Sequence, residues 1–402
     1  MRSGKRFRAQ HGAWPGMLLW LALFSCVAVA QDTQIPRQHR ALYDELAERV
    51  AAFRAALPRV QGDPPLLRGA SVRALSCVAP GELLMPMRRL EAQRELDGLL
   101  RAGVQAVVLD VCHPLLTAAF HDPRPILELL ANVANDVRVR GLRLVLRHAS
   151  LPPEQAVMQG RRHYRGMTKA RFFEERAEEA KLLVLAMQPD YLTLVSEPRS
   201  QAGLQLRPSD WQRYLEQTSA RLREAFADLV PHLGAGSPMA ESPVYVDAFA
   251  GVAGLDYIDL RFYRADSGQD ALLERLIAWP RAIRARDPGK RVVLSEVWLA
   301  KAGRDEPAPG PYQGASAARA SFGFWSPLDA AFLRAVAQAS RAGGIDLLAV
   351  SRPDLLFSYL DFFDPTLYRA SPRHVLDFAA QRAAGAQDAH QLSVTGRAFG
   401  AL

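Results

Sequence analysis

Short apolar runs alternate with longer segments of helical period along most of this chain. Each run is rich in Val, Leu and Ile, and a loop containing Gly, Pro or Ser separates it from the amphipathic segment that follows. Short buried strands that alternate with helices are typical of a parallel sheet. The pattern predicts strands at Gly69–Leu75, Gln105–Val111, Leu142–Leu146, Tyr191–Val195, His232–Ala235, Tyr257–Phe262, Arg291–Leu294 and Leu347–Val350.

The segments between these runs place apolar residues at three- and four-residue steps, as amphipathic helices do. Another such segment, Gln34–Ala56, predicts a helix before the first strand. Ser326 and Ser371 each precede a proline, so both serines are predicted to cap the helix that follows. The helices after the first strand are predicted at Met87–Ala102, Pro125–Arg140, Lys169–Met187, Ser209–Val230, Ser242–Val252, Gln269–Asp287, Pro327–Ala342 and Pro372–Ala384.

Eight strands, each followed by a helix, over about 320 residues predict a single (β/α)8 (TIM) barrel, an α/β fold. A doubly wound open sheet is the alternative, because His232–Ala235 is short and Val244–Val246 competes for the fifth strand. Gly234-Ala235-Gly236 lacks the third glycine of a nucleotide-binding fingerprint. The predicted organisation is a signal peptide (1–30), an N-terminal helix and linker (31–65), the barrel (66–385) and a C-terminal tail (386–402).

The N-terminal segment has the residue order of a secretory signal. Basic Lys5-Arg6 precedes the apolar stretch Met17–Val29, and Ala28-Val29-Ala30 supplies small residues for cleavage. The apolar stretch is shorter than the ~20 residues that a membrane-spanning helix needs. The sequence therefore predicts an exported protein, periplasmic or extracellular, without a membrane span. A lipid anchor at Cys26 is the second interpretation, because residues 23–26 resemble a lipoprotein signal ending.

The composition is 49% hydrophobic and 23% charged, as in globular proteins. The net charge is +8, and four of the positive charges lie in the predicted signal segment. The remaining Arg residues are interleaved with Glu and Asp, whereas a nucleic-acid-binding protein needs a clustered basic surface. The sequence therefore predicts no nucleic-acid partner.

Cys77 and Cys112 would remain after removal of the signal. Both are expected near the ends of neighbouring strands, so they can form a disulfide in an oxidising compartment. Two unpaired cysteines, packed as small apolar residues, are the alternative.

Two glutamates directly follow predicted strands, at the end of a (β/α)8 barrel where chemistry takes place. Glu197 follows the fourth strand and Glu296 follows the seventh. Carboxylates at these places can flank one glycosidic bond, where one protonates the leaving oxygen and the other attacks the anomeric carbon or activates water. This reaction needs no cofactor, and no short-spaced ligand pair predicts a metal site.

Other polar and aromatic residues after the strands are candidates for substrate binding: His113, His148, Tyr263 and Trp298. Each also has a structural interpretation, as a hydrogen-bonded rim residue for the histidines and as core packing for the aromatic rings. Arg147 and Arg261 follow strands as well, but no separate role is predicted for them. Residues 300–323, rich in Gly, Pro and Ala, are too long for an ordinary connection and predict a flexible loop over the cleft.

The passages Gln188–Pro198 and Leu255–Tyr263 resemble those of a clan of retaining glycoside hydrolases, most of all its endo-β-1,4-galactanase-like branch. The resemblance spans roughly residues 66–384. It implies that Glu197 is the acid/base and Glu296 the nucleophile. It also implies that Tyr263 orients the nucleophile and that His148 lines the sugar site.

The chain departs from that clan at two places. Ser196 replaces the Asn that usually precedes the acid/base and contacts the sugar 2-hydroxyl, and Ser351-Arg352-Pro353 replaces an aromatic residue after the eighth strand. The main prediction is a retaining hydrolase of a β-linked poly- or oligosaccharide. The departures favour one alternative, a barrel that binds glycans without cleaving them. A different barrel hydrolase or lyase, using Glu197 and Glu296 with His148, is the other.

Overall fold

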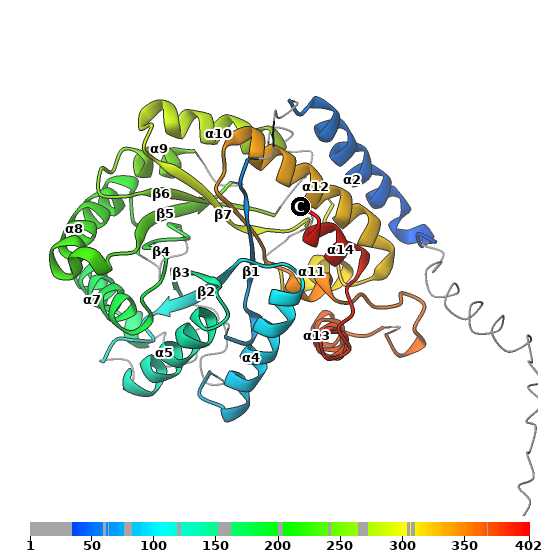
Figure 1. Cartoon of the computed structure of the whole chain (residues 1–402), viewed down its shortest axis with the longest axis horizontal. Coiled ribbons are helices and arrows are strands. Elements are labelled where there is room, and N and C mark those ends of the chain that lie inside the picture. Colours follow the sequence, from blue (N-terminus) through cyan, green and yellow to red (C-terminus); the bar gives the residue numbers. More distant parts are fainter. Residues whose placement is uncertain are drawn as a thin grey trace, which may run out of the picture.

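A closed barrel of eight parallel strands forms the centre of the computed structural model (Figure 1). The strands follow one another in chain order, and pairing of β8 with β1 closes the barrel. The closure confirms the predicted (β/α)8 barrel and excludes the open-sheet alternative. The strands are β1 (Leu67–Ser71), β2 (Ala106–His113), β3 (Arg143–Ser150), β4 (Tyr191–Thr193), β5 (His232–Pro238), β6 (Tyr257–Phe262), β7 (Arg291–Val297) and β8 (Leu347–Val350).

The structure describes residues 34–402, apart from 59–61, 63, 76–82, 119–121, 152–161, 200–203, 240–242, 264–271, 304–305, 307–309 and 368. The predicted signal segment, Cys26 and Cys77 lie outside the described residues. Cys112 is disulfide-bonded. The expected pairing with Cys77 stays a prediction.

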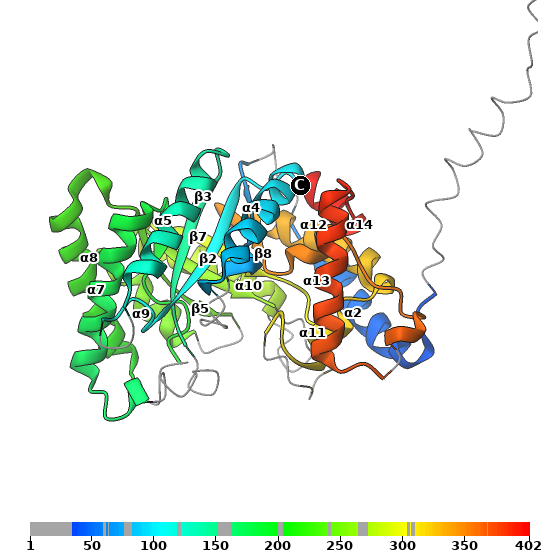
Figure 2. The same ribbon diagram turned by 90° about the horizontal axis from the view of Figure 1, so that it is seen from below.

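Helices surround the barrel and cover the outer faces of its strands (Figures 1 and 2). Those that follow the strands are α4 (Pro86–Arg101), α5 (Arg124–Arg138), α7 (Lys169–Met187), α8 (Pro208–Phe226), α9 (Val244–Ala250), α10 (Leu272–Arg286), α12 (Ser326–Gly343) and α13 (Pro372–Asp388). Three more are α2 (Arg37–Ala56), α11 (Gly314–Arg319) and α14 (Val394–Gly400). The 3-10 turns are η1 (Arg73–Leu75), η2 (Ala227–Leu229), η4 (Gly323–Trp325), η5 (Pro353–Leu356) and η6 (Pro365–Leu367).

Helices α2 and α14 both pack against α12. The ring of Tyr43 in α2 stacks on Trp325 at the start of α12, with centroids 5.4 Å apart. Phe399 of α14 is fully buried. The N-terminal helix and residues 394–400 therefore belong to the same packed body as the barrel.

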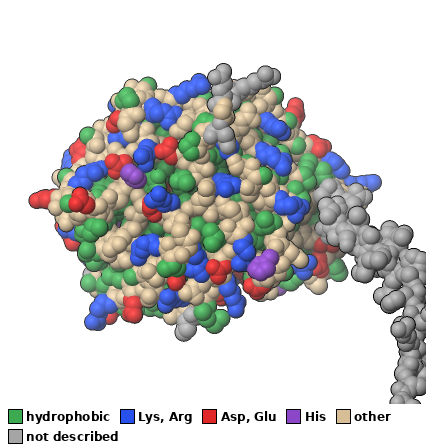
Figure 3. All heavy atoms as spheres, viewed as in Figure 1, with side chains coloured by type: hydrophobic (Ala, Val, Ile, Leu, Met, Phe, Trp, Pro, Cys, Tyr) green, Lys and Arg blue, Asp and Glu red, His purple; other side chains and the backbone are tan. Residues whose placement is uncertain are grey.

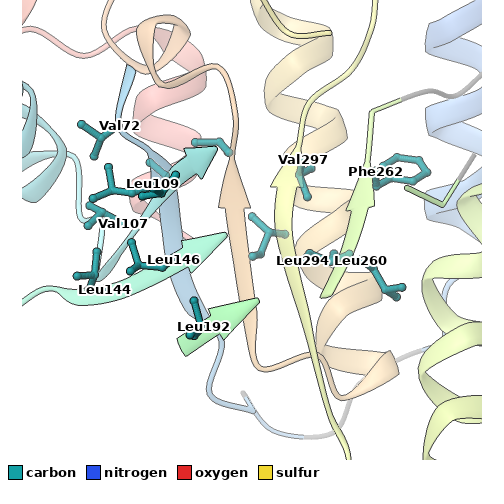
Figure 4. Close-up of a cluster of buried hydrophobic side chains, with 14 of the residues drawn as sticks. Val72, Val107, Leu109, Leu144, Leu146, Leu192, Leu260, Phe262, Leu294 and Val297 are labelled. Atoms are coloured by element: carbon teal, nitrogen blue, oxygen red, sulfur yellow. The ribbon is translucent and has the colours of Figure 1, made fainter. Parts of the chain in front are cut away.

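Two apolar layers result because successive residues of a strand point to opposite faces. The inner layer includes Val108, Val145, Tyr257 and Val293. The outer layer lies between strands and helices, and each buried Leu or Val there contributes roughly 1.5–3 kcal/mol by leaving water. Figure 4 shows part of this outer layer, with Val107, Leu109, Leu144, Leu146, Leu192, Leu260 and Leu294 among its residues.

Several local predictions are corrected by the structure. Ser371 does cap α13 by accepting a hydrogen bond from the His374 N–H, but Ser326 is the first residue of α12 and makes no such cap. Residues 244–246 begin helix α9 and do not form a strand. The segment 300–323, predicted as a flexible loop, contains helix α11, which packs against α13.

On the face seen in Figure 3, Lys and Arg side chains are intermixed with Asp and Glu, as the sequence led us to expect. Among the described residues, none of the helices combines the length and apolar character needed to cross a bilayer.

Candidate active site

Glu197 and Glu296 lie at the carboxyl end of the barrel, where they share one cationic neighbour. Arg261 of β6 donates a hydrogen bond from Nη1 to Glu197 Oε1 at 2.5 Å, and the same Nη1 lies 3.6 Å from Glu296 Oε2. The two carboxylate oxygens cannot be farther apart than the sum of these distances. That limit falls below the roughly 6.5–9.5 Å separation typical of inverting glycosidases.

A break in strand pairing turns Glu296 into the barrel. Leu260 pairs with Leu294, but the next residue, Arg261, pairs with Glu296, so Ser295 is skipped. Such a bulge changes the face to which the following side chains point. As a result, the adjacent residues Ser295 and Glu296 both point into the barrel, where they contact Asp259 and Arg147 respectively. In a regular strand, one of two adjacent side chains would point toward the helices instead.

Arg147 of β3 is the second cation of the site. Its guanidinium forms a two-pronged ion pair with Asp110 of β2, and its Nη1 donates to Glu296 Oε2 at 3.0 Å. Burial alone would lower the pKa of Arg147, but the carboxylates of Asp110 and Glu296 outweigh it and hold the pKa well above its ordinary value. Glu296 is thus held by two permanently charged cations.

Asp259 forms the floor beneath this site. Its carboxylate accepts hydrogen bonds from the Ser295 hydroxyl at 2.8 Å and from the Thr193 hydroxyl at 3.0 Å. Thr193 is also hydrogen-bonded to the Tyr257 hydroxyl at 2.7 Å. Burial raises the pKa of Asp259, and the nearby Arg147 only partly offsets this effect. These contacts fix Ser295 and, through it, the bulge that carries Glu296.

Two aromatic candidates lie together beyond β6 and β7. Tyr263 directly follows β6, and its ring stacks on that of Trp298 with centroids 6.3 Å apart and an interplanar angle of 19°. Tyr263 is half-buried and Trp298 is buried. Ser196, the neighbour of Glu197, is also buried.

The two predicted histidines face away from the barrel interior. Arg147 points inward, so the next residue, His148, points toward α7, where its Nε2 donates to Glu179 Oε2 at 2.8 Å. His113 contacts the same oxygen through Nδ1 at 3.0 Å. Both rings are fully buried, and burial followed by the charge of Arg176 lowers the pKa of His148 to about 4. This position is at odds with a direct contact to sugar by either histidine.

Arg352, the second residue after β8, is held by several contacts within the protein. Arg352 is buried and pairs with Asp354, with Nη2 and Oδ2 2.7 Å apart, and it also donates to the Ala317 carbonyl of α11. The Tyr312 ring lies over its guanidinium at 5.1 Å. The hydrogen bond to Ala317 joins the start of η5 to α11, at the place where the sequence resemblance led us to expect an aromatic residue.

Comparisons with known proteins place this geometry in context. No protein-family model matches the sequence, and no curated protein matches it. The structure is similar to an exo-β-1,4-mannosidase from Opitutaceae bacterium strain TAV5, with a TM-score of 0.50 and 14% identity over 80% of this chain. The match covers 60% of the mannosidase, so this chain corresponds to only part of that protein's length.

Two further solved structures give lower scores. A fungal β-1,4-galactanase has a TM-score of 0.42 and 14% identity, over 63% of this chain and 80% of its own. A modular endo-β-1,4-mannanase from Cellulomonas fimi has a TM-score of 0.47 and 15% identity, and the match covers 84% of this chain and 73% of the mannanase. The comparison with the mannosidase shows a shared fold, the (β/α)8 barrel.

Four charged residues in and beneath the site were not predicted from the sequence to have a role there: Asp110, Arg147, Asp259 and Arg261. The alternation of inward- and outward-facing residues along each strand could have indicated that these four side chains point into the barrel. Each lies two or four residues after an inward-facing apolar residue, as Asp110 follows Val108 and Arg147 follows Val145. Charged residues in phase with the interior of a barrel must find partners there.

Proposed function

We propose that this protein is a retaining glycoside hydrolase acting on a β-linked poly- or oligosaccharide. The observation that carries the proposal is the contact of one Arg261 nitrogen with both Glu197 and Glu296 at the carboxyl end of the barrel. Two carboxylates this close suit a double displacement, in which about 5–5.5 Å separates nucleophile and acid.

In the first step, a Glu296 oxygen attacks the anomeric carbon while the bond to the leaving oxygen breaks. Protonated Glu197 gives its proton to that oxygen, and a glycosyl ester forms on Glu296. In the second step, Glu197 takes a proton from water, whose oxygen displaces Glu296 and releases the sugar. The protons balance over the two steps, and no cofactor is needed.

The two arginines have different duties in this scheme. Arg147 orients Glu296 through its contact at 3.0 Å, and Asp110 holds Arg147 in place. The contact of Arg261 with Glu197 conflicts with the role of acid, because an adjacent cation favours the ionised form of a carboxyl group and Glu197 has to hold a proton. Substrate binding is therefore proposed to move Arg261 away from Glu197.

Tyr263, Trp298 and Ser196 are proposed to contact the sugar. The rings of Tyr263 and Trp298 stack on each other directly beyond β6 and β7, and the partly exposed Tyr263 ring can pack against a pyranose face. Tyr263 is also the proposed orienting partner of Glu296. Ser196 has a shorter reach than the usual Asn, so its contact with the 2-hydroxyl needs a bridging water.

We also propose that the protein is exported to the periplasm or the extracellular space. The support is the basic and apolar order of residues 1–30, together with the disulfide at Cys112. Mass spectrometry of the mature chain tests this. Cleavage after Ala30 gives a chain that begins at Gln31, whereas lipidation gives one that begins at a modified Cys26.

A barrel that binds glycans without cleaving them is the second candidate function. It is favoured by the ion pairs that engage both carboxylates and by Ser196 in place of Asn. A 2-deoxy-2-fluoroglycoside separates the two candidates, because only an active nucleophile is trapped as a stable ester. The mature protein is first screened on β-linked glycans, and the matching fluorosugar is then used. A mass increase localised to the peptide containing Glu296 supports the hydrolase, whereas glycan binding without labelling or turnover supports the binding barrel.

A further inference from the structure

A second cluster of chemistry-bearing side chains lies outside the barrel, between the ends of β2 and β3 and helix α7. His113 is the last residue of β2, His163 lies in a helical turn before α7, and Glu175 lies on α7. One ligand atom of each residue lies within 4.8 Å of the other two. We propose that these three residues bind a divalent transition metal ion, Zn²⁺ above all.

The protonation of His113 prepares it as a ligand. Its Nδ1 is 3.0 Å from Glu179 Oε2, and because a carboxylate oxygen only accepts, Nδ1 must carry the proton. In the neutral ring, the other nitrogen, Nε2, then has a free electron pair. The ring is fully buried and, among the described residues, Nε2 has no hydrogen-bond partner, although it lies 3.7 Å from Glu175 Oε2.

Glu175 turns one oxygen toward both imidazoles. Its Oε1 accepts from Arg171 Nε at 2.8 Å, which fixes the carboxylate. Its Oε2 lies 2.8 Å from His163 Nε2 and faces His113. The His163 side chain is 3% exposed and that of Glu175 is 14% exposed. Water can thus reach the cluster past Glu175 and supply a fourth ligand.

Glu179 supplies the outer support that metal-binding histidines usually have. Besides His113, its carboxylate accepts from His148 Nε2, the Leu116 N–H and the Thr117 hydroxyl. A carboxylate that holds the far nitrogen of a ligand histidine fixes the ring orientation and raises its basicity. Two imidazoles and one carboxylate form a donor set that zinc commonly takes.

The metal would join segments that are distant in the sequence. His113 and Glu175 belong to β2 and α7, and His163 belongs to the connection between β3 and α7. Binding would stabilise the folded chain, because a ligand that binds only the native state shifts the unfolding equilibrium. None of the three proposed ligands takes part in the proposed hydrolysis, so this inference is independent of the hydrolase.

Zinc binding to the full mature protein tests the inference. After treatment with a chelator and its removal, the protein is titrated with Zn²⁺ against a chromophoric competitor, and with Co²⁺ to record its visible absorption. We expect one Zn²⁺ per chain, Co²⁺ bands of a four-coordinate site, and a higher thermal midpoint with metal. His163→Gln and Glu175→Gln each keep polar contacts but should weaken binding by more than the roughly 10–100-fold cost of an outer-support change.

His374→Gln, at an exposed histidine on α13, is the matched control and should bind like the parent chain. Absence of stoichiometric Zn²⁺ binding by the folded parent protein would overturn the inference and leave a purely hydrogen-bonded cluster. Unchanged affinity in both His163→Gln and Glu175→Gln, with circular dichroism unchanged, would overturn it as well. Using two variants keeps the test decisive if one of them folds poorly.

Discussion

Glu296 pairs with Arg261 across β6 and β7 at the one step where the register between these strands shifts. Because of the shift, Ser295 does not pair with a residue of β6, and its hydroxyl and N–H donate hydrogen bonds to the Asp259 carboxylate instead. Glu296 is then aimed at Arg147 and Arg261. The bulge therefore connects an irregularity of the backbone to the position of the proposed nucleophile.

The first prediction concerns the two carboxylates. Glu296→Ala should abolish turnover of a confirmed glycan, because no other oxygen can form the ester. Glu197→Ala should lower kcat strongly on ordinary glycosides, by ~10²–10⁴-fold, because the leaving oxygen receives no proton. Glycosides with a good leaving group need less protonation, so the Glu197→Ala variant should still form the ester from them. Azide needs no general base to attack that ester, so added azide should restore turnover and yield a β-glycosyl azide.

Glu216→Gln, at an exposed position of α8, is the control for both variants and should retain full activity. Substantial turnover by Glu296→Ala would remove this residue from the mechanism. Azide products of inverted configuration would instead mean that the assignment of nucleophile and acid/base is incorrect.

The second prediction concerns Arg147. Among the ion pairs of the described residues, Arg147→Met leaves buried Glu296 with the longer contact to Arg261, and removal of one partner from a buried ion pair costs about 3–5 kcal/mol. Adding Glu296→Gln to this variant removes the uncompensated charge and should recover part of the loss. Urea unfolding of the two single variants and the double variant measures both effects.

Arg143 provides a matched control on the same strand. It pairs with Asp190 at 2.6 Å, but its side chain is 62% exposed. An exposed pair contributes about 0–1 kcal/mol, so Arg143→Met should change stability little. Equal losses for Arg143→Met and Arg147→Met would contradict a special role for the buried network.

The third prediction concerns pH and Glu95. This carboxyl of α4 accepts the N–H groups of Arg73 and Ala74 in η1, but burial outweighs them and raises its pKa to about 7. In the unfolded chain the pKa returns to its ordinary value, so the folded state binds the proton more tightly. The stabilisation is full below that ordinary value and is lost as pH rises toward 7, by about 3 kcal/mol.

Urea unfolding of the parent chain and of Glu95→Gln between pH 4 and 8 checks this. The neutral amide does not titrate, so the difference in stability between the two chains should change across the window in the stated direction. A constant difference over the whole range would show that Glu95 has an ordinary affinity for its proton.

The sequence predicted the barrel and the two glutamates because both depend on local patterns. Strand periodicity repeats through the chain, and a Glu after a buried run is visible without knowing the fold. The register shift at Ser295 could not be predicted, because it depends on hydrogen bonds to Asp259, which lies 36 residues away.

His148 was expected near the sugar because it follows a predicted strand end. In the structure β3 runs four residues farther, to Ser150, and alternation turns His148 toward Glu179.

The last prediction concerns the inner layer of the barrel at Gly234 of β5. A Cβ atom there would lie 2.3–2.5 Å from ring carbons of Tyr257. The Tyr257 hydroxyl is hydrogen-bonded to Thr193 beneath the candidate site. The ring cannot move freely because it is fully buried. Gly234→Ala should therefore lower the free energy of unfolding by about 1–3 kcal/mol, the usual cost of overpacking.

The same change at Gly385 of α13 should act in the opposite direction. No atom lies within 4 Å of a Cβ at that position, and alanine favours a helix over glycine by roughly 0.5–1 kcal/mol. Urea unfolding compares the two variants directly, and near-ultraviolet circular dichroism reports on the surroundings of Tyr257. If Gly234→Ala unfolds at the same urea concentration as the parent chain, the close approach of β5 to Tyr257 does not limit the packing of the barrel interior.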